Sequence, residues 1–339
     1  METGGAVREK ILSRRNVWLV AAIAIVAILA MLPLFGEKFT VQFATRVLIL
    51  TIFAMSLNLL VGFTGLVSLG HAAFFGVAGY CLALSVPQYQ AANFWISLPL
   101  AMLVSGILAL LVGLLVLRTS GVYFIMATLA FAQMVYFFFH DSGFAGGSDG
   151  IYIYARPDTS VAGWRFLDLE KFADLHYLVL ALFLLAFGFI RLLRDSPFGR
   201  VIAGIRVNEH RMRSLGFATF RYKLACFVIA GMMAGLAGYL AAVQYGVVNP
   251  EMLGWHLSGT VLMMVILGGM GTLSGPVIGA AAILLLEMGL QSLPETAGVS
   301  PGRHWQLPMG IVFVLVALFL PRGMAGLLAR RRVAVTDHD

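Results

Sequence analysis

The sequence contains few charged residues. Only 12% of its 339 residues are Asp, Glu, Lys or Arg, whereas 60% are hydrophobic. A soluble domain carries about 25% charged residues, so the composition excludes an ordinary soluble globular protein. Long apolar runs fill most of the chain, and about 20 apolar residues suffice for a helix to cross a bilayer. The sequence therefore predicts an all-α, polytopic membrane protein.

Cysteine is also scarce, and no cleavable signal peptide is evident. Cys81 and Cys226 both fall inside predicted spans. Two such thiols do not make a disulfide framework, and membrane cysteines most often act as small packing residues. Residues 17–35 lack a small-residue cleavage site, so we interpret them as a retained first span.

Motifs of familiar catalytic chemistry are missing as well. The chain has no GxxxxGK[ST] phosphate-binding loop, so we do not expect it to hydrolyse nucleotides itself. It has no HExxH, CxxC or GxSxG, and its spans hold no row of acids and bases of the kind proton-coupled carriers use. We therefore expect a protein that is not an enzyme, with no catalytic residue, cofactor or metal.

Ten apolar runs suit membrane spans and form one transmembrane domain over residues 17–321. The eighth and ninth are short and are separated by a glycine-rich breaker at 268–276. They are either two tilted spans or one span with a re-entrant piece. The ten predicted spans are residues 17–35, 43–62, 66–86, 95–117, 121–140, 174–194, 222–245, 257–270, 276–292 and 305–321.

Positive charge is unevenly distributed between the loops. If the tail 1–16, the turn at Arg118, residues 191–223 and the tail 322–339 face the cytoplasm, that side holds 17 of the 23 bases. This arrangement follows the positive-inside rule, which explains the net charge of +7 better than nucleic-acid binding does. We therefore expect both termini in the cytoplasm, an even number of spans, and one sizeable outer loop at 140–173.

The longest basic insert, residues 196–223, reads as two short helices. Ser196 and Pro197 suit the start of the first, and Asn208 and Gly216 suit the cap and the end of the second. A helix this short is only marginally stable alone, so something must hold it in place, and the flanking spans could do so. A small helix with a basic rim is suited to docking a partner, although a solvated connecting loop has the same composition. The candidate docking residues are Asn208, Glu209, Arg211, Met212, Arg213, Leu215 and Gly216.

Four polar side chains inside spans are candidates for a transport pathway. Asn58 and Gln133 either line a pathway or bridge two helices. His71 follows a glycine-rich break and is either functional or a hydrogen-bonded packing residue. Glu287 can meet a ligand ammonium group, pair with a buried donor or reach water.

Two pairs of glycines have the spacing of close helix contacts. Gly231 and Gly235 form one small-xxx-small pair, and Gly275 and Gly279 form another. Small residues at this spacing let helix backbones approach closely, so we predict a packing role for both pairs.

Several segments together resemble a known family. They are LNLLVGFTGLVSLGHAAFFGVAGY, GVYFIMATLAFAQMV, GGSDGI, SPFGRVIAGIRVNEHRMRSLGF, YKLACF, GGMGTLSGPVIGA and FLPRGMAGLL, in this order. The chain resembles the membrane permeases of bacterial branched-chain amino acid ABC transporters, of the LivM type, over roughly residues 43–328. Permeases for urea and short amides share much of the same pattern.

The resemblance implies a subunit of an ATP-driven importer in the bacterial inner membrane. Its partners would be a second related permease, two ATPase subunits and a periplasmic substrate-binding protein, with residues 196–223 as the segment that couples to the ATPases. Ser148 and Asp149, in the GGSDG loop, would meet the binding protein, or they form only a tight outer turn. The substrate would be a branched-chain or other hydrophobic amino acid. The alternatives are an importer of urea or short amides and an ion-coupled secondary carrier.

Overall fold

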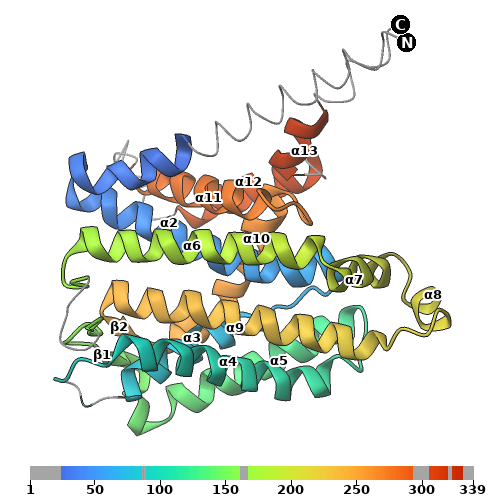
Figure 1. Ribbon diagram of the computed structural model, residues 1–339, viewed down its shortest axis with the longest axis horizontal. Helices are drawn as coiled ribbons and strands as arrows, with labels where there is room; N and C mark the ends of the chain where they lie inside the picture. The colour runs from blue at the N-terminus through green and yellow to red at the C-terminus, as the bar shows by residue number, and fades with distance from the viewer. Residues whose placement is uncertain are drawn as a thin grey trace, which may run out of the picture.

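The computed structural model describes residues 24–85, 87, 89–160, 167–292, 305–319 and 323–330. Almost every element in these ranges is a helix, and the long helices run side by side along the longest axis of the molecule (Figure 1). The all-α, polytopic prediction is confirmed. The helices long and apolar enough to cross a membrane are α2 (Lys38–Asn58) with its π-helical continuation η1 (Leu59–Thr64), α4 (Phe94–Val116), α5 (Val122–His140), α6 (Phe172–Asp195) and α9 (Thr219–Tyr245).

Within the described residues, shorter apolar helices complete the bundle and coincide with the remaining predicted spans to within a few residues, except at the start of the third span. They are Ala24–Phe35, α3 (Ala72–Ser85), α10 (Trp255–Gly268), α11 (Gly275–Gln291) and α12 (Gln306–Phe319). A further short helix, α13 (Gly323–Arg330), packs against α10 and α11.

Two helices, α2 with η1 and α9, form the centre of the bundle. In their most apolar stretches 89% and 83% of the positions are buried, against 17% in α5. Helix α9 packs against α2, α3 and α4. The approach is close because α9 presents glycine: a Cβ at Gly238 would lie 1.8 Å from the Phe75 carbonyl oxygen. At Gly231 and Gly235 a Cβ would meet Ala109 and Ser105 of α4. The packing role predicted for this pair is confirmed.

Helices α10 and α11 are separate and pack against each other as a hairpin. The second glycine pair makes this contact. A Cβ at Gly279 would lie 1.8 Å from the Met264 carbonyl oxygen, and one at Gly275 would lie 2.5 Å from that of Gly269. The packing role predicted for Gly275 and Gly279 is therefore also confirmed.

The third predicted span, 66–86, is wrong at its start. The chain leaves η1 at Gly65, which has a φ of +75°, and residues 65–71 are not helical before α3 begins at Ala72. At Gly70 a Cβ would lie 2.2 Å from the Thr128 carbonyl oxygen of α5. The backbone therefore runs against α5 here as a non-helical segment, and the close approach requires glycine at position 70. Conversely, the second span continues beyond residue 62, because η1 extends it to Thr64.

The two ends of the bundle carry different structures (Figure 1). At one end, α7 (Pro197–Val207) and α8 (Glu209–Ser214) connect α6 to α9, and α8 lies at the extremity of the molecule. At the other end, β1 (Ile151–Tyr152) pairs antiparallel with β2 (Val247–Val248), with Ile151 opposite Val248. The short helices η2 (Gly143–Ala145), η3 (Gly147–Asp149) and η4 (Pro250–Leu253) lie in the same loops.

Candidate functional site

Helix α7 starts and packs as its sequence pattern predicts. The Ser196 hydroxyl accepts a hydrogen bond from the Gly199 amide at 3.2 Å, which caps the helix. Ile202 and Ile205 are buried, and the Phe198 ring packs 5.6 Å from the Tyr222 ring of α9. Phe198, Ile202 and Ile205, spaced along one face, therefore hold α7 against the bundle and leave its other face exposed.

Helix α8 is a single short helix with capped ends. The Asn208 side chain accepts a hydrogen bond from the Arg211 amide at 2.9 Å, and Glu209 occupies the first turn. The helix ends before Gly216, which has a φ of +86°. Both predicted boundaries are confirmed.

Glu209 connects α8 to the start of α9. Its carboxylate is 2.7 Å from Nη2 of Arg213, accepts a hydrogen bond from the Thr219 hydroxyl at 3.0 Å, and pairs with the ammonium group of Lys223. Burial alone would raise the pKa of Glu209, but these bonds, that of Lys223 above all, outweigh it and hold the pKa below its ordinary value. The carboxylate is therefore ionised at neutral pH and anchors the short helix.

The outward face of this segment differs in part from the sequence expectation. Met212 packs inward, since a Cβ at Gly204 of α7 would lie 2.8 Å from its sulfur. Arg213 is bound to Glu209, whereas Arg211 is exposed. The most exposed apolar side chains are Val207 and Leu215, at 87% and 66% of their full exposure, whereas Phe217 is exposed to 36%. The surface best placed to meet a partner is thus Val207, Arg211 and Leu215.

The membrane helices have two interruptions, residues 65–71 after η1 and residues 269–274 between α10 and α11, which we call the inner breaks. Asn58, at the end of α2, bonds to the second of them. Its side-chain nitrogen donates to the Thr272 carbonyl at 2.9 Å, and its oxygen accepts from the Gly271 amide at 2.9 Å. The side chain is buried. Of the two readings of Asn58, the structure shows the helix-bridging contact.

Arg206, on α7, contacts the same region. Its guanidinium donates to the Gly62 carbonyl in η1, and a Cβ at Gly271 would lie 3.0 Å from the same nitrogen. The sequence reasoning did not single out Arg206, because nothing in the spacing of the basic insert distinguishes it from the other arginines there.

His71 lies at the end of the first inner break and is completely buried. Its Nε2 is 2.9 Å from the Ser56 hydroxyl, and its ring stacks on Phe53 with centroids 5.5 Å apart. Its Nδ1 is buried without a hydrogen-bond partner among the described residues. This is the environment of a packed, hydrogen-bonded histidine.

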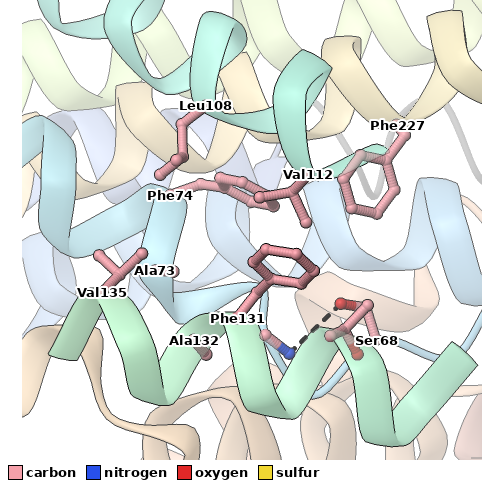
Figure 2. Close-up of a pocket in the computed structure, with 11 residues that line it drawn as sticks. Ser68, Ala73, Phe74, Leu108, Val112, Phe131, Ala132, Val135 and Phe227 are labelled. Carbon is pink, nitrogen blue, oxygen red and sulfur yellow. Dashed lines mark hydrogen bonds between the residues drawn. The ribbon is translucent and has the colours of Figure 1, made fainter. Parts of the chain in front are cut away.

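A small apolar pocket lies between the first inner break, α4, α5 and α9 (Figure 2). Leu108 and Val112 of α4 face Phe131 of α5 across it, and Ser68 of the break stands at its edge (Figure 2). The Thr128 hydroxyl of α5 accepts a hydrogen bond from the Leu69 amide at 3.3 Å. The space holds about one water molecule, so in this conformation it does not admit an amino acid.

Glu287, on α11, pairs with a base in a neighbouring helix. Nη2 of Arg46, on α2, lies 3.4 Å from its Oε1, and Gln291 donates to the same oxygen at 3.3 Å. Of the three roles considered for Glu287, the structure shows pairing, but with a donor whose side chain is 40% exposed and not buried. Arg46 was missed, although a base inside a predicted span is itself a signal of a polar partner in a neighbouring span. Gln133, in contrast, lies partly exposed on α5.

Ser148 and Asp149 are exposed in η3, at the end of the bundle opposite to α8 (Figure 1). The Ser148 hydroxyl lies 3.3 Å from the Asp149 carboxylate. Their flanking glycines are required by the turn, since a Cβ at Gly150 would lie 2.1 Å from the Val248 carbonyl oxygen. The loop is therefore a tight turn that holds these two polar side chains at the surface.

Comparison with known proteins gives a consistent picture. The chain is 30% identical, over 320 residues, to the high-affinity branched-chain amino acid transport system permease protein LivM of Salmonella typhimurium, covering 89% of this chain and 73% of that protein. It is 29% identical over the same shares to LivM of Escherichia coli. The Escherichia coli permease LivH matches at 29% identity over 40% of this chain and 41% of its own length. No solved structure matches.

The family model described as the permease component of branched-chain amino acid transport systems matches residues 39–317, most of the chain. The match includes the segment 196–223, both inner breaks and the outer turn. The relatives are transport permeases and not enzymes, as we expected of this chain. This multi-pass membrane protein therefore belongs to the family of branched-chain amino acid transport permeases.

Proposed function

We propose that this chain, together with a second related permease, forms the translocation pathway of an ATP-driven importer for branched-chain or other hydrophobic amino acids. In this assembly two ATPase subunits dock on segment 196–223, and a periplasmic binding protein delivers the substrate to the opposite end. Both termini face the cytoplasm, on the side of α8.

The form and position of α8 carry this proposal. The helix projects from the end of the bundle and is fixed to α7 and α9 (Figure 1). It exposes Arg211, and Val207 and Leu215 are exposed beside its two ends. Exposed apolar side chains beside a cation are suited to a groove on another protein. The sequence has no phosphate-binding loop of its own, so the energy of ATP has to reach the chain through such a contact.

The docking surface is tested best by changing residues that support nothing else in the chain. We expect Leu215→Asp combined with Arg211→Glu to abolish co-purification of the ATPase subunits and uptake, without lowering the thermal stability of the isolated permease. Arg213→Glu is a poorer test, because it also breaks the bond to Glu209. Normal uptake by the double variant in proteoliposomes that contain all partners would rule out the docking assignment.

A pathway shared with a second permease requires a face that this chain leaves uncovered. Helix α5 provides that face, and Gln133 is the pathway candidate that is partly exposed on it. Asn58, His71 and Glu287 bond within the chain in this conformation, so they enter the pathway only if those bonds open. We expect Gln133→Leu to change uptake while the protein remains folded.

The outer turn is the proposed contact for the binding protein. Ser148 and Asp149 are exposed there, far from α8. We expect Asp149→Lys to weaken the stimulation of ATP hydrolysis by the loaded binding protein and to leave basal hydrolysis unchanged. An unchanged stimulation curve would place the contact elsewhere.

The substrate is identified through the partner protein. Isothermal titration of the binding protein with Leu, Ile, Val, Phe and urea separates an amino acid importer from an importer of short amides. Uptake by the purified chain alone, driven by an ion gradient without ATP, would instead establish a secondary carrier and end the proposal.

A further inference from the structure

The end of helix α2 and η1 are held to the second inner break, residues 269–274, as one unit. Asn58, at the end of α2, makes two hydrogen bonds to the backbone of residues 271 and 272. The backbones also touch directly, because a Cβ at Gly62 would lie 2.5 Å from the Gly271 nitrogen. A displacement of η1 therefore moves the loop between α10 and α11 with it.

Arg206 contacts this unit from outside the membrane helices. Its Nη1 donates to the Gly62 carbonyl, its Cγ would lie 3.4 Å from a Cβ at Gly65, and its Nη1 would lie 3.0 Å from a Cβ at Gly271. One side chain on α7 thus touches the end of η1 and the loop between α10 and α11.

The local chemistry at Gly62 favours a cation. Gly62 lies in the last turn of the helix formed by α2 and η1, which ends at Gly65. The last carbonyls of a helix lack intrahelical partners and carry the negative end of its dipole. The guanidinium of Arg206 supplies both a donor and a positive charge at this point.

Helix α7 does not move independently of the docking surface. Met212 of α8 packs on Gly204 of α7, and Glu209 joins α8 to Lys223 of α9. Helix α8 follows α7 after the single cap residue Asn208. A partner that displaces α8 therefore displaces α7, and Arg206 with it.

We propose that Arg206 is the positioning residue through which movement of segment 196–223 reaches the inner breaks. Its contact with Gly62 and Gly271 makes η1 and the α10–α11 loop follow the docked ATPase subunits, so the two breaks shift together when the pathway opens inward. This inference rests on the proposed function, but the contact itself can be tested without it.

The functional test compares Arg206→Ala with Arg200→Ala in the complete complex. Arg200 is exposed on the same helix, so its variant removes the same charge from another face. We expect Arg206→Ala to co-purify with the ATPases and to hydrolyse ATP, but to lower the amino acid taken up per ATP at least about fivefold, the usual lower range of coupling between sites. Arg206→Lys should recover part of this ratio, and Arg200→Ala should match the wild type.

A ratio within twofold of the wild type in Arg206→Ala would overturn the inference. So would a loss of ATPase binding that Arg200→Ala shares, because the effect would then be one of docking charge. If the wild-type complex itself takes up no amino acid, the proposed function fails, and the inference is judged by a second measurement.

That measurement is amide hydrogen exchange on the isolated permease in detergent micelles. We expect Arg206→Ala to speed exchange at residues 62–66 and 269–275 together, and Arg200→Ala to change neither. Unchanged exchange in both breaks would contradict the link, as would faster exchange throughout the bundle, which indicates general unfolding.

Discussion

Helices α9 and α5 are both long and apolar, but α9 lies at the centre of the bundle and α5 at its periphery. Both are long and apolar enough to cross a membrane, yet 83% of the most apolar stretch of α9 is buried and only 17% of that of α5. Helix α9 places Gly231, Gly235 and Gly238 against its neighbours, whereas α5 exposes large side chains such as Tyr123 and Phe137.

The difference shows that hydrophobicity alone does not determine which helix lies at the centre of this protein. Lipid is as apolar as the side chains, so burial within the bundle brings no hydrophobic gain. What favours α9 is close backbone approach and hydrogen bonding between helices, such as the 2.7 Å bond between the Ser97 hydroxyl of α4 and the Tyr239 hydroxyl. Helix α5 has few such contacts and keeps a face free for a partner or for lipid.

The largest effect is expected where a side chain replaces a glycine of α9. A Cβ at Gly238 would lie 1.8 Å from a backbone oxygen of α3, so Gly238→Leu should destabilise the fold by more than about 3 kcal/mol and abolish monodisperse protein. Gly188, on α6, has nothing within 4 Å of the same position and provides the matched control. Equal yields and thermal midpoints for Gly238→Leu and Gly188→Leu would break the comparison.

A second test removes a side-chain amide either from the central helix α2 or from the peripheral helix α5. Asn58→Ala leaves the Gly271 amide and the Thr272 carbonyl without their partner, which should cost about 2–4 kcal/mol of folding stability. Gln133→Ala on α5 should cost much less, since that side chain is partly exposed. Thermal unfolding in detergent decides the matter, and a larger loss for Gln133→Ala would contradict the assignment of centre and periphery.

Glu209 allows a comparison of a partly buried carboxylate with an exposed one at the end of the bundle that carries α8. Glu209→Gln removes the charge that binds Lys223 and Arg213 and should lower stability by about 1–2 kcal/mol. Asp195→Asn, which affects an exposed pair with Arg194, should have little effect. Similar unfolding midpoints for the two variants would show that Glu209 does not anchor α8.

The anchoring of α8 should also depend on pH. Because the folded-state pKa of Glu209 lies below its ordinary value of 4.5, its contribution is complete above that value and is lost as the pH falls through the folded-state pKa. A spin label at Leu215 should therefore gain mobility on acidification in the wild type. In Glu209→Gln it should be mobile already at neutral pH, and an immobile label there would refute the role of the carboxylate.

The smallest effect is expected on the outer face of α5. Met134→Ala should change the stability of the isolated chain by less than about 0.5 kcal/mol, because the side chain is exposed. In the complex with a second permease the same change should weaken assembly if this face is the contact. Strong destabilisation of the isolated chain would mean that this face of α5 is packed within the bundle, and would contradict the assignment of α5 to the periphery.

Apolar runs and helix-capping residues were sufficient to predict the long helices and the two short helices of segment 196–223. The caps at Ser196 and Asn208, the stop at Gly216 and the close glycine contacts followed from local rules, and the structure confirms them. The predicted span 66–86 includes most of the break at 65–71, because the break contains apolar residues. Its backbone nevertheless departs from the helix at a single glycine, Gly65.

By itself, the sequence determined that this chain is an all-α membrane protein with a structured basic segment, because apolar length, capping and charge act along the chain. Only the tertiary structure decided which helix is central, that Met212 packs inward on Gly204, that Asn58 joins α2 to the break at 269–274 and that Arg206 reaches Gly62. Asn58 and Arg206 contact residues 214 and 144 positions away in the sequence. Their partners are backbone carbonyls and amides, which every residue carries, so no pattern of side chains could reveal them.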